Sequence, residues 1–188
     1  YLRGHNKQEQ EWVRCGSMGT MSVFSFYANK LVTSGEGGMI VTNDSHLAAK
    51  ARSIRNLCFE PDQRFIHNNL GHNFRMTNMQ AALGLAQSER IQETVNWKRR
   101  MGKRYTERLS DIKAIQLPIE RSWSHQVYWM YGILLDKSHN LTASALADKL
   151  SDLGIQTRPF FLGMHAQPAL QNLGLFQSQD YPVADHLS

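Results

Sequence analysis

Cysteine is scarce in this sequence, and long apolar runs are missing from it. The 188 residues contain two cysteines, Cys15 and Cys58, too few for a disulfide framework, and neither has a metal-ligand spacing. We therefore expect a protein of the reducing cytoplasm with no metal site. No stretch approaches the ~20 apolar residues that cross a bilayer, so we also expect no membrane partner.

The sequence also lacks a signal peptide, an internal repeat and a low-complexity tract. It opens on Tyr1 rather than Met, and we expect it to be part of a longer protein. Its hydrophobic fraction of 41% is that of an ordinary globular chain. The length allows one domain with a sizeable core, or one large and one small domain.

Positive charge is in excess, with a formal net charge of +5. Such an excess suits either nucleic acid or a small anionic substrate. The most basic stretch has apolar neighbours at helical spacing, which indicates a solvated helix face; it comprises Lys98, Arg99, Arg100, Lys103, Arg104 and Arg108. No base-reading motif or aromatic ladder accompanies it, so we expect no nucleic-acid partner.

The first part of the chain predicts two strands and a helix. Residues 21–27 are rich in aromatic and β-branched side chains, and a glycine-rich turn separates them from an apolar strand at 39–42. Residues 43–45 are typical of a helix start, and we expect this helix to reach about Leu57. A polar loop at 58–72 follows, and loops of that length are unusual unless functional.

Thr77 and Gln80 have the spacing of a capping box. They predict a helix from Asn78 to about Val95, followed by a second helix near 97–109. One apolar stripe of the first helix is expected to be buried; it comprises Met79, Ala82, Leu83, Ala86 and Arg90.

The last part of the chain continues the alternation of strands and helices that is typical of an α/β protein. We expect strands at 127–135 and 155–161, the second ended or made an edge by Pro159. Between them, Thr142 caps a helix that ends at Gly154. Loop and short helix follow. Two aromatic residues of these strands, Trp129 and Phe160, are expected in the core.

Lys30 is the residue that most suggests chemistry. It follows the strand at 21–27 by three residues and Ser25 by five. Burial disfavours the ammonium form of a lysine leaving a buried strand, and a neutral amine can attack a carbonyl to form a Schiff base. A hydroxyl beside glycine-rich backbone can bind phosphate. Taken alone, the six residues from Ser25 to Lys30 favour the simpler interpretation of a solvated lysine at a strand end.

An ordered series of motifs runs along the chain from near residue 14. The motifs are Gly16-Ser17-Met18-Gly19, Phe24-Ser25-Phe26 with Lys30, Thr33-Ser34-Gly35-Glu36-Gly37-Gly38-Met39, Gly71-His72-Asn73-Phe74-Arg75-Met76-Thr77-Asn78, Ala81-Ala82-Leu83-Gly84, Tyr128-Trp129-Met130, Thr157-Arg158-Pro159-Phe160-Phe161 and Met164-His165-Ala166-Gln167-Pro168. In this order they resemble the DegT/DnrJ/EryC1/StrS family of nucleotide-sugar aminotransferases, and the resemblance covers essentially all of the chain after residue 14.

The resemblance implies an α/β fold of the aspartate-aminotransferase type, also called fold type I of the enzymes that use pyridoxal 5′-phosphate. Residues 1–96 would form the C-terminal part of the large, mostly parallel-sheet domain. Residues 97–188 would form an incomplete small domain. Family members are homodimers with active sites at the subunit interface.

The resemblance also implies site residues. Lys30 would form a Schiff base with pyridoxal phosphate and then move protons as general base and acid. Ser25 would hydrogen-bond the cofactor phosphate, and Asn73 would reach the phosphate of the partner subunit. Arg158 and His165 would contact the nucleotide-diphosphate sugar, although each fits a structural role about as well. Glutamate would donate the amino group to a keto sugar.

Two departures from the family pattern stand out. The upstream half of the family, which carries the acid that pairs with the pyridinium nitrogen and the aromatic residue that stacks on the ring, is absent from this chain. A tyrosine of the family motif is His72 here and another is Phe74, while Asn73 is kept.

Three other functions compete with transamination. A sugar dehydratase of the same family uses the same cofactor, but such enzymes tend to have a histidine where Lys30 stands. A fragment that only dimerises is the second alternative. A nucleic-acid binder, supported only by charge, is the third.

Overall fold

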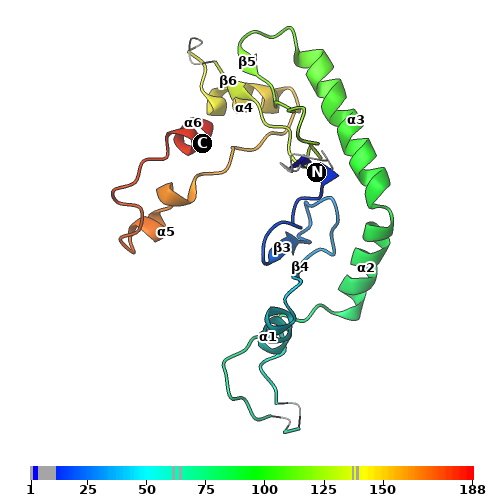
Figure 1. Cartoon of the computed structure of the whole chain (residues 1–188). Coiled ribbons are helices and arrows are strands. Elements are labelled where there is room, and N and C mark those ends of the chain that lie inside the picture. The colour runs from blue at the N-terminus through cyan, green and yellow to red at the C-terminus, as the bar shows by residue number, and fades with distance from the viewer. Residues whose placement is uncertain (1, 4–11, 61, 64, 137, 139) are drawn as a thin grey trace. The chain divides into compact units, whose positions relative to one another are not determined.

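The computed structural model describes residues 2–3, 12–60, 62–63, 65–136, 138 and 140–188 (Figure 1). The chain forms two compact units. The first comprises residues 1–103 and 120–129, and the second comprises residues 104–119 and 130–188.

The first unit contains an antiparallel hairpin. Strand β3 (Ser22–Ser25) pairs with β4 (Gly38–Val41), in a register that sets Ser22 opposite Val41 and Ser25 opposite Gly38. Both strands were predicted. The expectation that the strand before Lys30 is buried is wrong, because Val23 of β3 is 77% exposed. No residue of β4 is buried either. A second antiparallel pair joins β1 (Leu2–Arg3) to β2 (Trp12–Val13).

Helix α1 (Ser45–Arg55) begins where the sequence predicts it. Asp44 accepts hydrogen bonds from the backbone N–H groups of His46 and Leu47, at 2.8 and 3.0 Å. These bonds satisfy donors that have no partner inside the helix. The predicted loop follows it, and the two ends of this loop are joined by an antiparallel bridge between Asn56 and Asn73.

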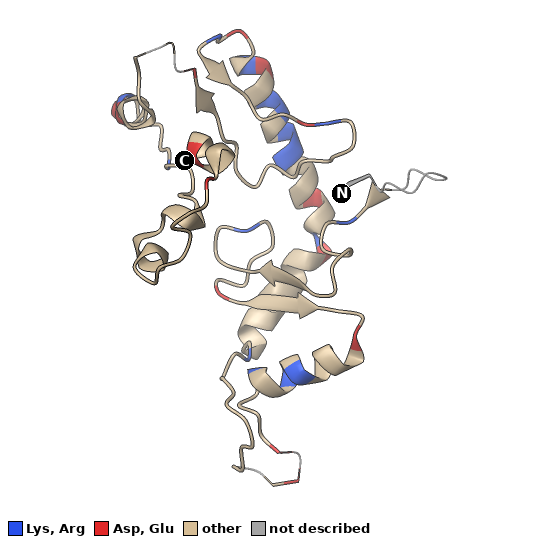
Figure 2. Ribbon diagram, turned by 60° about the vertical axis from the view of Figure 1, so that its left-hand side comes forward, with Lys and Arg blue, Asp and Glu red and all other residues tan. Residues whose placement is uncertain are grey.

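Helix α2 (Asn78–Glu89) has the predicted capping box at Thr77 and Gln80. It is shorter than predicted, since Arg90 caps its end and α3 (Ile91–Leu109) starts one residue later. The basic residues predicted on a helix face lie on α3, where most of the charged residues are Lys or Arg (Figure 2).

The predicted buried stripe of α2 is wrong. All five of its residues are exposed, Met79 by 85% and Leu83 by 46%. The buried residue of α2 is Gly84. A Cβ atom on Gly84 would lie 3.8 Å from the Cβ of Ser34. Helix α2 therefore packs against the connection between β3 and β4 through the face that carries Gly84. Apolar spacing identified the helix but not the side that its neighbours cover.

The second unit contains one short antiparallel pair and several helices. Strand β5 (Ile115–Gln116) pairs with β6 (Leu134–Leu135). Helix α4 (Ala143–Asp152) is capped by Thr142, as predicted, and Gly154 follows it with φ of +78°. The remaining helices are η1 (Met164–Ala166), α5 (Pro168–Gln171) and α6 (Pro182–Leu187).

One of two predicted strands forms only at its end, and the other is absent. Of residues 127–135, only the last two are in a strand, β6. The φ of +49° at Tyr128 turns the chain out of an extended path near the start of this segment. Residues 155–161 contain no strand, and Pro159 among them has no N–H to donate to a ladder. Phe160, predicted in the core, is 53% exposed.

Few side chains of the described residues are buried. The buried apolar ones are Cys58 and Tyr128, and Ser34 is the buried polar one. All strand pairs among the described residues are antiparallel, so the parallel pairing expected of the family's large domain is not seen in this part of the chain. None of the described helices combines the length and apolar character required to cross a bilayer.

Candidate functional site

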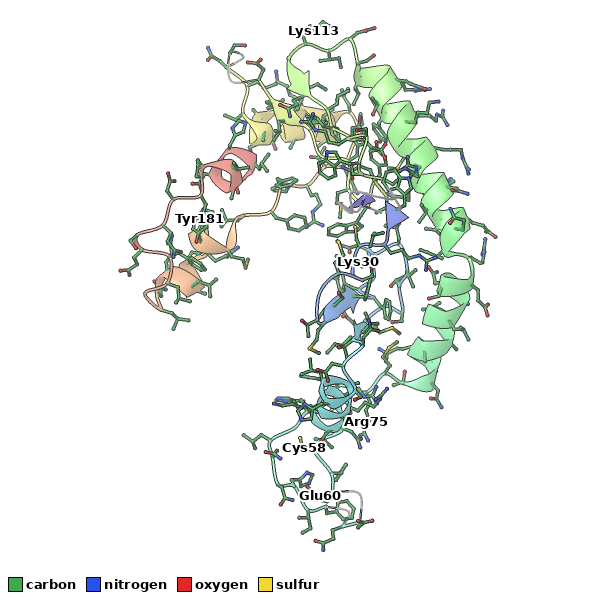
Figure 3. All side chains as sticks on the ribbon, in the orientation of Figure 1. Lys30, Cys58, Glu60, Arg75, Lys113 and Tyr181 are labelled. Atoms are coloured by element: carbon green, nitrogen blue, oxygen red, sulfur yellow. The ribbon has the colours of Figure 1, made fainter. Side chains whose placement is uncertain are left out.

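Lys30 lies in the connection between β3 and β4 (Figure 3). Backbone hydrogen bonds fix this connection: Phe26 N–H donates to Gly37 O at 2.8 Å, Lys30 N–H to Tyr27 O at 3.0 Å, and Ser34 N–H to Phe26 O at 3.0 Å. The Thr33 hydroxyl also donates to Phe26 O, at 3.0 Å. These hydrogen bonds fix the backbone at Lys30, although most of β3 is exposed. The Lys30 residue itself is half-buried.

The amine of Lys30 lies over an indole ring. Its Nζ is 3.5 Å from the ring centroid of Trp129, a distance that gives a cation–π interaction. The indole Nε1–H donates to Asn29 O at 2.9 Å. Trp129 was expected in the core, but it is half-buried. It contacts the side chain of Lys30 and the backbone carbonyl of the preceding residue, Asn29.

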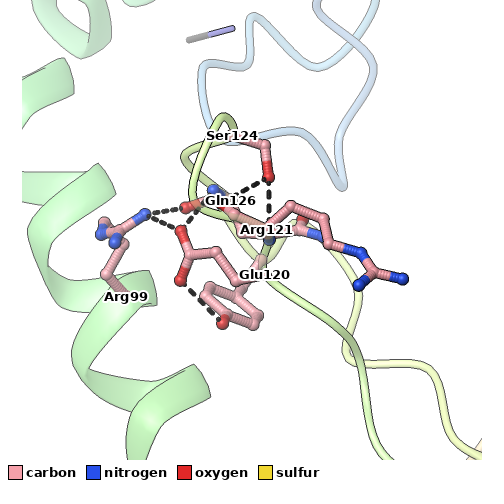
Figure 4. Close-up of polar contacts among 6 residues, drawn as sticks. Arg99, Glu120, Arg121, Ser124 and Gln126 are labelled. Atoms are coloured by element: carbon pink, nitrogen blue, oxygen red, sulfur yellow. Dashed lines mark hydrogen bonds and ion pairs between the residues drawn. The ribbon is translucent and has the colours of Figure 1, made fainter. Parts of the chain in front are cut away.

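Polar contacts on the neighbouring residues hold this part of the chain against α3. Gln126 N–H donates to Glu120 Oε1 at 2.8 Å, and Arg99 of α3 pairs with the same oxygen at 2.9 Å (Figure 4). The Arg99 guanidinium also donates to Gln126 O. The Tyr128 hydroxyl donates to Glu120 Oε2 at 3.3 Å.

Glu120 is thus surrounded by donors. Burial raises the pKa of Glu120, but the hydrogen bond from Gln126 N–H, the hydrogen bond and charge of Arg99 and the hydrogen bond from Tyr128 lower it by more. The net effect holds the pKa of this carboxyl below its ordinary value of 4.5. An ionised Glu120 therefore fixes the backbone that leads to Trp129.

Ser25 ends β3, opposite Gly38. Its hydroxyl oxygen accepts a weak hydrogen bond from Tyr27 N–H at 3.4 Å, and its side chain is exposed. The same hairpin therefore carries Ser25 and Lys30, one at the end of the strand and one in the connection after it.

Asn73 lies at the base of the loop that follows α1. Its side-chain oxygen accepts a hydrogen bond from Arg75 Nε at 2.9 Å, and Arg75 also donates to Asn56 Oδ1 at 3.0 Å. These contacts show that Asn73 shapes the loop base.

Arg158 and His165 both belong to the second unit. The guanidinium carbon of Arg158 lies 5.0 Å from the ring centroid of Phe161. His165 Nε2 lies 2.6 Å from Asp185 Oδ1, and its ring stacks on Tyr181 with centroids 4.6 Å apart. His165 therefore has structural contacts in its own unit.

The sequence reasoning missed Trp129 and Glu120 as neighbours of the Lys30 region. One signal was present for Trp129, since an indole N–H that is taken from water needs a hydrogen-bond acceptor. The acceptor, Asn29 O, lies about a hundred residues away in the chain and could not be guessed from spacing. Nothing in the sequence around Glu120 indicates its ring of donors.

The donors present suit pyridoxal phosphate in kind. Lys30, whose backbone is fixed by hydrogen bonds, offers a primary amine that can react with an aldehyde. Ser25 offers a hydroxyl that can bind a phosphate. Across the parts of the chain that the structure describes, no group of three or more His, Cys, Asp or Glu side chains is placed to hold a metal ion.

The sequence matches the family described as the DegT/DnrJ/EryC1/StrS aminotransferase family over residues 4–188. It is 39% identical to the GDP-perosamine synthase of Caulobacter vibrioides over 92% of this chain and 46% of that protein. The chain thus spans about half the length of the curated relatives it matches. Aminotransferases of this family use pyridoxal phosphate.

Solved structures agree on the fold. Helicobacter pylori PseC, an aminotransferase involved in the biosynthesis of pseudoaminic acid, matches with a TM-score of 0.82 at 25% identity, covering 99% of this chain and 49% of that one. The Escherichia coli GDP-4-keto-6-deoxy-D-mannose-3-dehydratase with bound hydrated pyridoxal phosphate matches with a TM-score of 0.69 at 21% identity, covering 78% of this chain and 41% of that one. At that identity the second likeness concerns the fold alone.

Proposed function

Because the chain belongs to the DegT/DnrJ/EryC1/StrS aminotransferase family, we propose that it is the lysine-bearing part of a sugar aminotransferase. Lys30 is the residue that binds pyridoxal phosphate. The observation that carries the proposal is the placement of this lysine, half-buried, on a hydrogen-bonded connection directly after β3. A backbone fixed in this way limits the positions that the lysine amine can take, which favours its reaction with a bound cofactor.

The chemistry divides between cofactor and protein. When bound, pyridoxal phosphate withdraws electrons from the substrate carbon that carries the amino group. The Lys30 amine then acts as base and acid, taking the proton from that carbon and returning it at C4′ of the cofactor. Ser25 holds the phosphate by a hydrogen bond, since its hydroxyl is exposed beside the same connection.

The proposed substrate is a keto sugar linked to a nucleotide diphosphate, with glutamate as the amino donor. A 4-keto-6-deoxy hexose on GDP is the first candidate, because three relatives at 32 to 39% identity carry the name GDP-perosamine synthase. Arg158 supplies a cation for the diphosphate and His165 a hydrogen bond for the sugar. The net charge of +5 is compatible with such anionic substrates.

The protein is proposed to act as a cytoplasmic homodimer in the synthesis of cell-surface polysaccharide, such as the O-antigen of lipopolysaccharide. Asn73 then serves the cofactor phosphate of the partner subunit. Large apolar side chains such as Leu70 and Phe74 are 95% and 70% exposed near Asn73 in the sequence. A partner subunit seated there would remove this surface from water.

A dehydratase is the less favoured member of the same family. The lysine at position 30 supports transamination, because the amine can both bind the cofactor and move the proton. A histidine could move a proton but could not form a Schiff base.

The first experiment labels the cofactor-bearing residue in the complete natural protein. The protein is reduced with borohydride after its visible spectrum is recorded, and the modified peptide is mapped by mass spectrometry. We expect the adduct on Lys30, with none on Lys50 or Lys98, and no adduct at position 30 in K30R. A protein that cannot be charged with pyridoxal phosphate, or an adduct on another lysine, contradicts the proposal.

The second experiment identifies the substrate. GDP- and dTDP-linked 4-keto-6-deoxy sugars are each incubated with ¹⁵N-glutamate, and the products are analysed by mass spectrometry. We expect ¹⁵N in a GDP-linked sugar. Loss of a hydroxyl without gain of nitrogen would instead identify a dehydratase.

A further inference from the structure

The contact between Trp129 and Lys30 is not explained by packing alone. The indole touches the lysine in two ways, through its ring face to Nζ at 3.5 Å and through its N–H to the Asn29 carbonyl at 2.9 Å. One contact reaches the end of the side chain and the other the peptide bond at its base. Together these contacts hold both the base and the amine of a long and flexible side chain in place.

Trp129 is itself held in place by its neighbours in the first unit. The ring of Tyr128 is buried, with 9% of its surface exposed, and its hydroxyl bonds to Glu120. The positive φ of Tyr128 turns the chain so that two consecutive side chains serve different partners. A positive φ on an aromatic residue costs free energy and persists where surrounding contacts enforce it.

We propose that Trp129 is a positioning residue for Lys30: its ring face holds the free amine near the place where it reacts, and its N–H fixes the backbone that carries it. The inference deepens the proposed function and rests on it for the role of Lys30. The face of an aromatic ring is electron-rich and attracts an ammonium group. A lysine that must leave and rejoin a carbonyl would therefore stay within reach instead of turning into solvent.

The first test measures the accessibility and reactivity of the Lys30 amine in the cofactor-free complete protein. A limiting amount of an acetylating reagent is added at fixed pH, and the acetylation of Lys30 is compared with that of Lys50 by peptide mass spectrometry. In W129L the Lys30-to-Lys50 ratio should rise about two- to five-fold, the factor that corresponds to the strength of an exposed cation–π contact. In W129F, which keeps an aromatic face, the ratio should stay near the wild-type value.

Trp97 provides a matched control, because it lies in the same unit and is 60% exposed on α3. W97L and W97F should leave the ratio unchanged. An unchanged ratio in W129L overturns the proposal, as does an equal rise in W129F and W129L, because the aromatic face would then make no contribution.

A second measurement needs no substitution at Trp129 and so does not depend on the folding of a variant. The lysines are reductively methylated with ¹³C-formaldehyde, and the dimethyl-amine resonance of Lys30 is assigned by its loss in K30R. We expect the ring current of the indole to move this resonance upfield of those of the other lysines. A Lys30 resonance among those of the other lysines would contradict the contact.

The two proposals fail differently. If borohydride fixes the cofactor on another lysine, the proposed function fails even when the Lys30 resonance is shifted. If the cofactor is fixed on Lys30 while the resonance and the labelling ratio are both unaffected by the indole, the proposed function stands and the role of Trp129 is refuted.

Discussion

Tyr128 lies with its ring against Gly102 of α3, so closely that a Cβ atom on residue 102 would fall 2.6 Å from the ring Cγ. The glycine is buried inside a helix of 19 residues, where alanine would ordinarily be the better helix former. The close approach of the ring therefore explains why a glycine stands at this position.

The first prediction concerns this pair of residues. G102A should lower the free energy of unfolding by about 1 to 3 kcal/mol, because the added methyl group overpacks against the ring. G84A provides the control, since its Cβ would meet Ser34 at an ordinary 3.8 Å, and it should stabilise by roughly 0.5 to 1 kcal/mol through helix propensity. Urea unfolding of both variants measures the difference. Stabilisation by both substitutions would show that Tyr128 can move aside.

The second prediction concerns Glu120 and pH. Its pKa is lower in the folded state than its ordinary value of 4.5, so the unfolded state binds protons more readily and stability is lost as pH falls through the folded pKa. E120Q should lower the free energy of unfolding at pH 7 by about 1 kcal/mol, allowing for the partial exposure of the pair. The difference from wild type should shrink toward pH 3.

Urea unfolding at a series of pH values from 7 to 3 measures this effect. E89Q makes the same chemical change at an exposed position on the last turn of α2, and it should leave the pH profile unchanged. A constant gap between E120Q and wild type at all pH values would show that the charge of Glu120 is not what stabilises the fold.

The third prediction tests the phosphate role of Ser25. In a K30A background, where pyridoxal phosphate can bind only non-covalently, the further change S25A should weaken cofactor binding about tenfold, because a hydrogen bond to a charged group is lost. S22A lies in the same strand and should have no such effect. Equilibrium titration by absorbance gives the dissociation constants. Equal binding by K30A and K30A/S25A would remove Ser25 from the site.

The fourth prediction tests whether Asn73 acts across a dimer. K30A alone should be inactive and N73A strongly impaired, but mixed dimers should contain one site with an intact Lys30 from one subunit and an intact Asn73 from the other. Dimers purified with two different affinity tags should therefore regain about half of the wild-type activity, the share of one site in two. If Asn73 served its own subunit, mixing would restore nothing.

Local signals in the sequence predicted much of the fold. Aspartate, threonine and glutamine at helix starts give hydrogen bonds within a few residues, so α1, α2 and α4 begin where predicted. The strands β3 and β4 were placed within about two residues by their composition. Each of these features depends on interactions between neighbours in the chain.

The errors arose where distant residues decide the structure. The positive φ of Tyr128 follows from its packing on Gly102 and its bond to Glu120, not from the apolar residues beside it. The exposed stripe of α2 has ideal spacing, yet the helix packs through Gly84. For the site, the sequence indicated Lys30 by resemblance, while its contact with Trp129 joins positions 99 residues apart and required the structure.

The loop between α1 and α2 is closed at its base. The bridge between Asn56 and Asn73 is extended by hydrogen bonds from Leu57 N–H to His72 O at 3.1 Å and from His72 N–H to Ile54 O at 2.7 Å. These backbone bonds fix the ends of the loop independently of the residues at its tip. Substitutions of exposed side chains such as Phe65 and Ile66 should therefore leave Asn73 in its place.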